Sequence, residues 1–103
     1  MLFKKKKNEE TIKYVNLQAE ILQRVSSDYN VSINTIIGKC RNSELVDIRC
    51  IIASVLFKIG YYESAIGRVL GGRHHTTVIN LLQRTKKRKD LEKAVKVYLK
   101  IFK

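Results

Sequence analysis

Apolar residues recur every three or four positions along most of this chain, which is the spacing that places them on one face of an α-helix. The first such segment runs from Glu9 to about Asp28, and no segment alternates residue by residue as a strand would. The pattern therefore predicts an all-α protein that begins with a long amphipathic helix. The apolar face of that helix would be formed by Ile12, Val15, Ala19, Leu22 and Val25.

Start and stop signals in the middle of the chain predict a short helix and then a long one. Ser32 is a suitable N-cap for the short helix, Gly38 would end it, and residues 39–42 form a basic loop. Ser43 would cap the long helix, which runs to about Ile59 and carries apolar residues around most of its circumference. We expect this long helix to be the most buried element of the fold.

The last third of the chain predicts three further helices, which brings the expected total to about six in one compact bundle. Two of them flank a corner at Gly71 and Gly72, and the second continues to about Lys86. Asp90 would cap the last helix. Its apolar side would be formed by Leu91, Ala94, Val95, Tyr98, Leu99 and Phe102.

The Gly-Gly corner has the pattern of a helix-turn-helix. The helices before and after it each carry three apolar residues on one face, so the two can pack together. These residues are Ile66, Val69 and Leu70 in the first helix and Val78, Leu81 and Leu82 in the second.

The second helix of this pair opens with Arg73, His74, His75, Thr76 and Thr77. Their side chains and unpaired backbone N–H groups would lie at the positive end of the helix dipole, where anions bind. Phosphate is the obvious candidate.

The charge balance also indicates a polyanionic partner. The 103 residues include 21 Lys and Arg against 9 Asp and Glu, a net charge of +12. Residues 1–50 hold 9 basic and 6 acidic residues, whereas residues 51–103 hold 12 and 3. The positive excess therefore belongs mainly to the half that contains the corner.

Other functional classes find little support in the residues. Cys40 and Cys50 are too few for a disulfide scaffold, and no apolar stretch approaches the ~18 residues of a membrane span, so we expect a cytoplasmic protein. The adjacent His74 and His75 do not face the same way on a helix, so we expect no metal site. No catalytic constellation stands out, so we expect neither an enzyme nor a cofactor.

The segment GGRHHTTV, residues 71–78, closely resembles the GGRDHTTV signature of the C-terminal DNA-binding domain (domain IV) of the bacterial replication initiator DnaA. The similarity extends over about Ile21 to Arg84. It implies a Trp repressor-like helical bundle that binds double-stranded DNA, with the helix-turn-helix in the major groove and the basic loop in the adjacent minor groove. We accordingly predict a basic tail over residues 1–8 and a single helical DNA-binding domain over residues 9–103 that acts at the nucleoid.

Site roles follow from the resemblance position by position. Arg41 would be the minor-groove arginine, His75 and Thr76 would face base edges, and Thr77 would hold a phosphate. Arg49 and Asn80 would lie near the DNA backbone, and the complete predicted contact set is Arg41, Arg49, Arg73, His74, His75, Thr76, Thr77, Asn80 and Arg84.

Three departures from the family pattern matter. His74 stands where the family has an aspartate, which changes the hydrogen-bond repertoire and predicts a different preferred box. Ser64 and Ala65 replace a proline-containing turn. The sequence has no GxxxxGK[ST] loop, so we expect a stand-alone regulator of replication or transcription without ATPase activity, with replication or transcription proteins as further partners.

Two alternatives come from other classes. An RNA or single-strand binder would share the basic charge but would show aromatic stacking residues among the charges, and Tyr61 and Tyr62 are the only such pair. A protein-interaction module would dock the apolar face of the segment from Leu91 to Phe102 on a partner or on a second copy.

Overall fold

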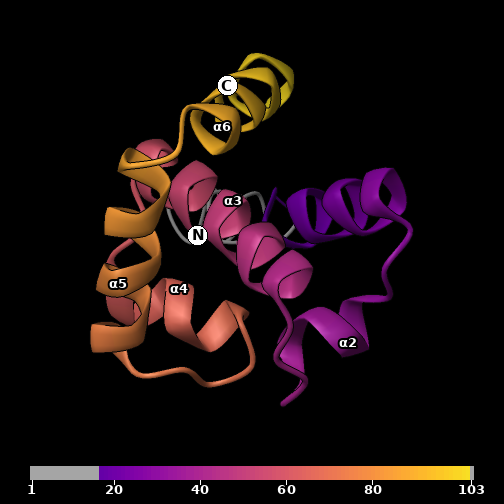
Figure 1. The fold of residues 1–103 in the computed structure, drawn as a ribbon, viewed down its shortest axis with the longest axis vertical. Helices are drawn as coiled ribbons and strands as arrows, with labels where there is room; N and C mark the ends of the chain where they lie inside the picture. The colour runs from indigo at the N-terminus through magenta and orange to yellow at the C-terminus, as the bar shows by residue number, and fades with distance from the viewer. Residues whose placement is uncertain (1–16, 103) are drawn as a thin grey trace, which may run out of the picture.

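The computed structural model describes residues 17–102, which form six helices and no strand (Figure 1). The expected all-α architecture is therefore confirmed for this part of the chain. The first described helix covers residues 17–29. The predicted basic tail, and the predicted helix start at Glu9 with Ile12 and Val15, lie outside the described residues.

The apolar face of the helix over residues 17–29 differs from the prediction, which included Ala19 and left out Leu17 and Ile21. Ile21 and Val25 have no solvent-exposed surface, and Leu17 and Leu22 pack against the same core, whereas Ala19 is exposed. The larger side chains at four-residue spacing set which face turns inward, because burial of a leucine or isoleucine contributes far more than burial of a methyl group.

The next two helices begin and end close to the predicted residues. Helix α2 (Ile33–Ile37) is capped by the Ser32 hydroxyl and ends at Gly38, as predicted. Helix α3 (Ser43–Ile59) has Asn42 as its N-cap, because the Asn42 side-chain oxygen accepts the Leu45 backbone N–H at 2.9 Å. The prediction that Ser43 caps α3 was wrong by one residue.

Helix α3 is the centre of the fold, as its apolar circumference predicted. It packs against α2, α4, α5 and α6. In Figure 1 it runs through the middle of the molecule, with α4 (Glu63–Val69) and α5 (His75–Lys86) on one side and α2 with the helix over residues 17–29 on the other. Eight apolar residues of α3 are buried: Leu45, Ile48, Cys50, Ile51, Ile52, Ala53, Val55 and Leu56.

The corner between α4 and α5 depends on glycines at two close contacts. A Cβ atom at Gly67 would lie 2.0 Å from the Arg73 carbonyl oxygen. Gly71 has φ +86°, in the left-handed region, and a Cβ atom there would lie 2.1 Å from the Ile37 carbonyl oxygen. The corner is therefore pressed against the end of α2, and only glycine fits.

Helix α6 (Lys89–Phe102) begins two residues before Leu91, which would be its first residue if Asp90 were the cap. Asp90 does not cap it but lies in its first turn, where its carboxylate accepts the Arg88 guanidinium at 2.8 Å. The apolar face proposed as a docking surface is largely internal, because Leu91, Val95 and Tyr98 pack in the core of the molecule. That interpretation of the face is wrong. No described helix is long and apolar enough to cross a membrane.

Candidate nucleic-acid interface

A basic hollow of about 500 Å³ opens between α3, α5 and the loop after α2. It contains six of the nine predicted contact residues, although they are spread over more than forty positions of the sequence. The lining residues are Lys39, Arg41, Val46, Arg49, Arg73, Thr77, Asn80, Leu81 and Arg84. Tertiary packing thus gathers four arginines, from the loop after α2, from α3, from the corner and from α5, around one concave surface.

Arg49 reaches this hollow from α3 but is 3% exposed, and its donors point into the protein. Its Nε donates to the Ile36 carbonyl at 2.7 Å and its Nη2 to the Cys40 carbonyl at 2.8 Å. Longer bonds from Nη2 reach the carbonyls of Thr35 and Gly38. Burial, and then the positive charge of Arg73, lower the pKa of the Arg49 guanidinium. Arg49 therefore closes the C-terminal end of α2 and holds the following loop against α3.

Arg73, directly after the corner, binds the same segment from the other side. Its Nη2 donates to the Gly38 carbonyl at 2.7 Å, and its Nη1 donates to the carbonyls of Ile37 and Leu70. Burial, and then the charge of Arg41, lower its pKa. The buried Arg49 and the half-buried Arg73 thus share the Gly38 carbonyl and join the loop after α2 to the helix-turn-helix.

The loop that these arginines hold presents its own charges to solvent. Arg41 is exposed, and no ion pair or hydrogen bond within residues 17–102 involves its side chain. Lys39, also exposed, lines the same hollow and was not among the predicted contacts. Its place in the predicted basic loop was the available signal, since a loop held at both ends brings all its charges to one surface.

His74 caps α5. Its Nδ1 accepts the Thr76 backbone N–H at 3.2 Å and lies 3.0 Å from the Thr76 hydroxyl. Because the Thr76 backbone N–H can only donate, Nδ1 carries no proton when it accepts this bond. The His74 ring therefore fills the capping position that an aspartate would fill.

The first turn of α5 offers side chains rather than a row of unpaired backbone donors. The Thr77 N–H donates to the His74 carbonyl at 3.0 Å, and the Thr76 N–H is taken by the His74 ring. The expectation that these N–H groups are unpaired was wrong. His75, Thr76 and Thr77 are nevertheless all exposed, and none is covered by another element.

Helical spacing extends this surface along α5. Asn80 and Arg84 follow Thr77 at three and seven residues, so all three side chains lie on the side of α5 that faces the hollow. His74, His75 and Thr76 lie at the exposed end of the same helix and do not line the hollow. The rings of His74 and His75 pack with their centroids 4.2 Å apart. Within the described residues, no group of three His, Cys, Asp or Glu side chains could hold a metal ion.

Comparison with known proteins gives a specific match to this part of the chain. The family model described as the bacterial dnaA protein helix-turn-helix matches residues 18–85. The chromosomal replication initiator protein DnaA of Oenococcus oeni is 46% identical over 63 residues, which are 59% of this chain and 14% of that protein. The protein of the same name from Mycoplasma capricolum subsp. capricolum is 39% identical over 84 residues, 76% of this chain and 18% of that protein.

The chain thus spans less than a fifth of the length of these curated relatives. No solved structure matches it.

Proposed function

Since this chain belongs to the family of bacterial DnaA helix-turn-helix domains, which bind DNA, we propose that it binds double-stranded DNA in a sequence-selective manner. In this proposal the exposed end of α5 enters the major groove, and the loop that carries Lys39 and Arg41 enters the adjacent minor groove. The observation that carries the proposal is the basic hollow, because it combines α5 and this loop in one concave surface.

The roles of individual residues follow from their exposure and chemistry. We assign phosphate contacts to Thr77 and Asn80, because both line the hollow and are exposed. His75 and Thr76 lie at the exposed tip of α5 and would reach base edges. Arg41 has the length and charge to enter a narrow A/T-rich minor groove.

Arg49 receives a different role from the one the resemblance implied. Its donors already bind carbonyl oxygens of the protein, so we propose that it positions the loop rather than contacting the DNA backbone. Arg73 shares this positioning role through the Gly38 carbonyl. Buried guanidinium groups bonded to several carbonyls are well suited to fix a loop, because their planar fork is rigid.

The biological output we propose is regulation of replication or transcription by occupation of chromosomal sites, without ATP hydrolysis. The curated relatives are chromosomal replication initiators, which supports replication as the process. Adding ATP should leave the affinity of this chain for DNA unchanged, and an ATP-dependent gain in affinity would contradict that part of the proposal.

The test begins with a duplex box selected from a randomised library and a scrambled duplex of equal length. The chain should prefer the selected box, and equal affinity for both would refute selective binding. If about six phosphates are neutralised, a plot of log affinity against log salt concentration should have a slope of about −5. Competition with RNA of the same sequence separates duplex DNA binding from the RNA-binding alternative.

Two substitutions separate positioning on the backbone from base recognition. Thr77→Ala should weaken binding to all duplexes alike, because a phosphate contact carries no sequence information. His75→Ala should instead flatten discrimination at one or two base pairs. The reverse pattern would show that the roles of the two side chains have been exchanged.

A further inference from the structure

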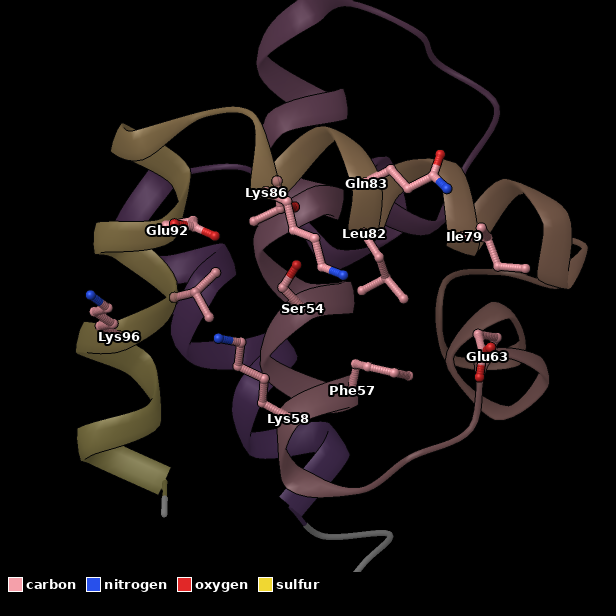
Figure 2. A pocket seen from close by; sticks show the side chains of 12 residues that line it. Ser54, Phe57, Lys58, Glu63, Ile79, Leu82, Gln83, Lys86, Glu92 and Lys96 are labelled. Atoms are coloured by element: carbon pink, nitrogen blue, oxygen red, sulfur yellow. The ribbon is translucent and has the colours of Figure 1, made fainter.

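A second pocket of about 330 Å³ lies on the opposite side of α5 from the basic hollow, between α3, α5 and α6 (Figure 2). The α5 residues that line it are Ile79, Leu82, Gln83, Thr85 and Lys86, whereas Thr77, Asn80 and Arg84 line the hollow. At about 100° per residue, most of these two sets point in opposite directions from the helix axis. The pocket is therefore separate from the proposed DNA surface.

The walls of this pocket are mainly apolar. Phe57 of α3 is 44% exposed and lies at its edge, and Leu82 of α5 projects into it (Figure 2). Val95 of α6 supplies part of the opposite wall. An exposed phenylalanine beside partly buried aliphatic side chains offers a surface from which an apolar ligand would displace water.

The polar groups of the pocket include the hydroxyl of a largely buried serine. Ser54 is 5% exposed, and its hydroxyl has no hydrogen-bond partner within residues 17–102. Figure 2 shows its oxygen directed into the space between the helices, with the amines of Lys58 and Lys86 on either side of it in this view. Because no fully buried side-chain nitrogen or oxygen of the described residues lacks a partner, the Ser54 hydroxyl is open to the pocket, where water or a ligand can bond to it.

The lysines are also available to a ligand. Neither Lys58 nor Lys86 takes part in any ion pair of the described residues, although Glu63 and Glu92 line the same pocket. Lys96 also lines the pocket, but its amine points away from it in Figure 2. Lys58 and Lys86 thus supply two ammonium groups beside an apolar floor.

We propose that this pocket binds a small organic acid that carries its carboxylate on an apolar body. The apolar part would lie against Phe57 and Leu82, and the carboxylate would accept hydrogen bonds from Ser54 and the two lysines. The volume lies at the lower end of the range for small-molecule sites, which favours a small ligand over the face of a partner protein.

The test uses the full chain, titrated with 4-phenylbutyrate and, separately, with the neutral 4-phenylbutanol, while amide chemical shifts are recorded. The acid should cause saturable shifts centred on Ser54, Phe57 and Lys86. It should bind about tenfold more tightly than the alcohol, because the alcohol lacks the charge that the lysines attract.

Matched variants test the polar groups. Lys86→Met should weaken binding of 4-phenylbutyrate about three- to tenfold, and Ser54→Ala should also weaken it. Lys100→Met is the control, because it removes the same charge from the last turn of α6 outside the pocket. All three variants should retain the unfolding temperature of the parent chain within a few degrees, since none removes a contact that the structure records.

Three outcomes would overturn the proposal. One is equal affinity for the acid and the alcohol. Another is a set of shifts centred on Arg41, Arg73 and Arg84, which would place the anion in the basic hollow. The third is the absence of saturable shifts with 4-phenylbutyrate, indole-3-acetate and octanoate alike. That result would favour contact between this pocket and a larger partner instead of a small organic acid.

Discussion

Replacing Arg49 by methionine tests how a buried arginine contributes to a DNA-binding surface that it does not itself form. Methionine keeps an unbranched stem of similar course and removes the guanidinium. The carbonyls of Ile36 and Cys40 would then lose the only hydrogen-bond donors that the structure gives them within residues 17–102. Thr35 and Gly38 keep other donors, from the Gly38 N–H and from Arg73.

The magnitude follows from these two carbonyls. An unsatisfied buried acceptor costs about 1 to 3 kcal/mol, and Cys40 lies at the surface, where water can replace the lost donor. We therefore expect the free energy of unfolding to fall by about 1 to 3 kcal/mol, mainly through the Ile36 carbonyl. The loop over residues 39–41 would also be less ordered before binding, so the affinity for the selected box should fall about tenfold.

The assay combines urea unfolding with DNA titrations at several salt concentrations, under conditions where the variant is folded. If Arg49 only positions the loop, affinity falls while the salt slope stays the same, because the number of neutralised phosphates is unchanged. Arg49→Lys should also lose affinity, since an ammonium group cannot reproduce the planar fork that binds several carbonyls.

Arg24→Met provides the control, because it removes the same charge from an exposed residue of the helix over residues 17–29. It should change the free energy of unfolding by no more than about 1 kcal/mol. The reasoning would be refuted if Arg49→Met left stability unchanged and lowered the salt slope by about 0.9, the signature of one lost phosphate contact.

Three further predictions concern the corner, the α5 cap and the C-terminal helix. Gly71→Ala should lower the free energy of unfolding by about 2 kcal/mol more than Gly72→Ala. Both glycines have positive φ, but only at Gly71 would a Cβ atom meet backbone atoms. Equal urea midpoints for the two variants would contradict this prediction. His74→Asp should retain stability and change the preferred base at one position of the selected box, whereas His74→Ala should lose about 1 kcal/mol of cap stability; equal losses would show that the ring is not a cap. Burial, and then the hydrogen bond to Asp28, raise the pKa of Tyr98 above its usual value of 10.0. The contribution of the Tyr98 hydroxyl to stability is therefore complete below pH 10.0 and is lost as the pH rises through the raised pKa. Tyr98→Phe should flatten this alkaline loss of stability, and an unchanged loss would contradict the prediction.

The order and type of the helices could be predicted because they depend on local signals. Ser32 and Gly38 begin and end helix α2 as their chemistry indicated, and Gly71 and Gly72 adopt the positive φ expected at the corner. The predicted helix starts were wrong by one residue at Ser43 and by two residues at Asp90. Asn42 and Ser43 are both suitable N-cap residues, and the sequence does not show which of them caps α3. The same holds for the start of α6, which begins at Lys89, before Asp90.

The candidate site was partly predictable. The family resemblance predicted contacts at Arg41 and in the first turn of α5, and the structure leaves these side chains exposed. It did not reveal that the Arg49 guanidinium turns inward, because a side chain's direction depends on which carbonyls another segment brings within reach. Lys39 was missed for the same kind of reason, since only the held loop places it beside α5.

By itself, the sequence determined that this protein is helical, strongly basic and built around a Gly-Gly corner, because helix periodicity, net charge and left-handed glycine positions are properties of neighbouring residues. The tertiary structure decided which charged side chains share a surface and which bind carbonyl oxygens inside the protein. Arg49 and Arg73 bind carbonyls at the end of α2 and leave Arg41 exposed, and the two sides of α5 are divided between a basic hollow and an apolar pocket. Those distinctions arise from contacts between segments far apart in the chain, and no local pattern of residues encodes them.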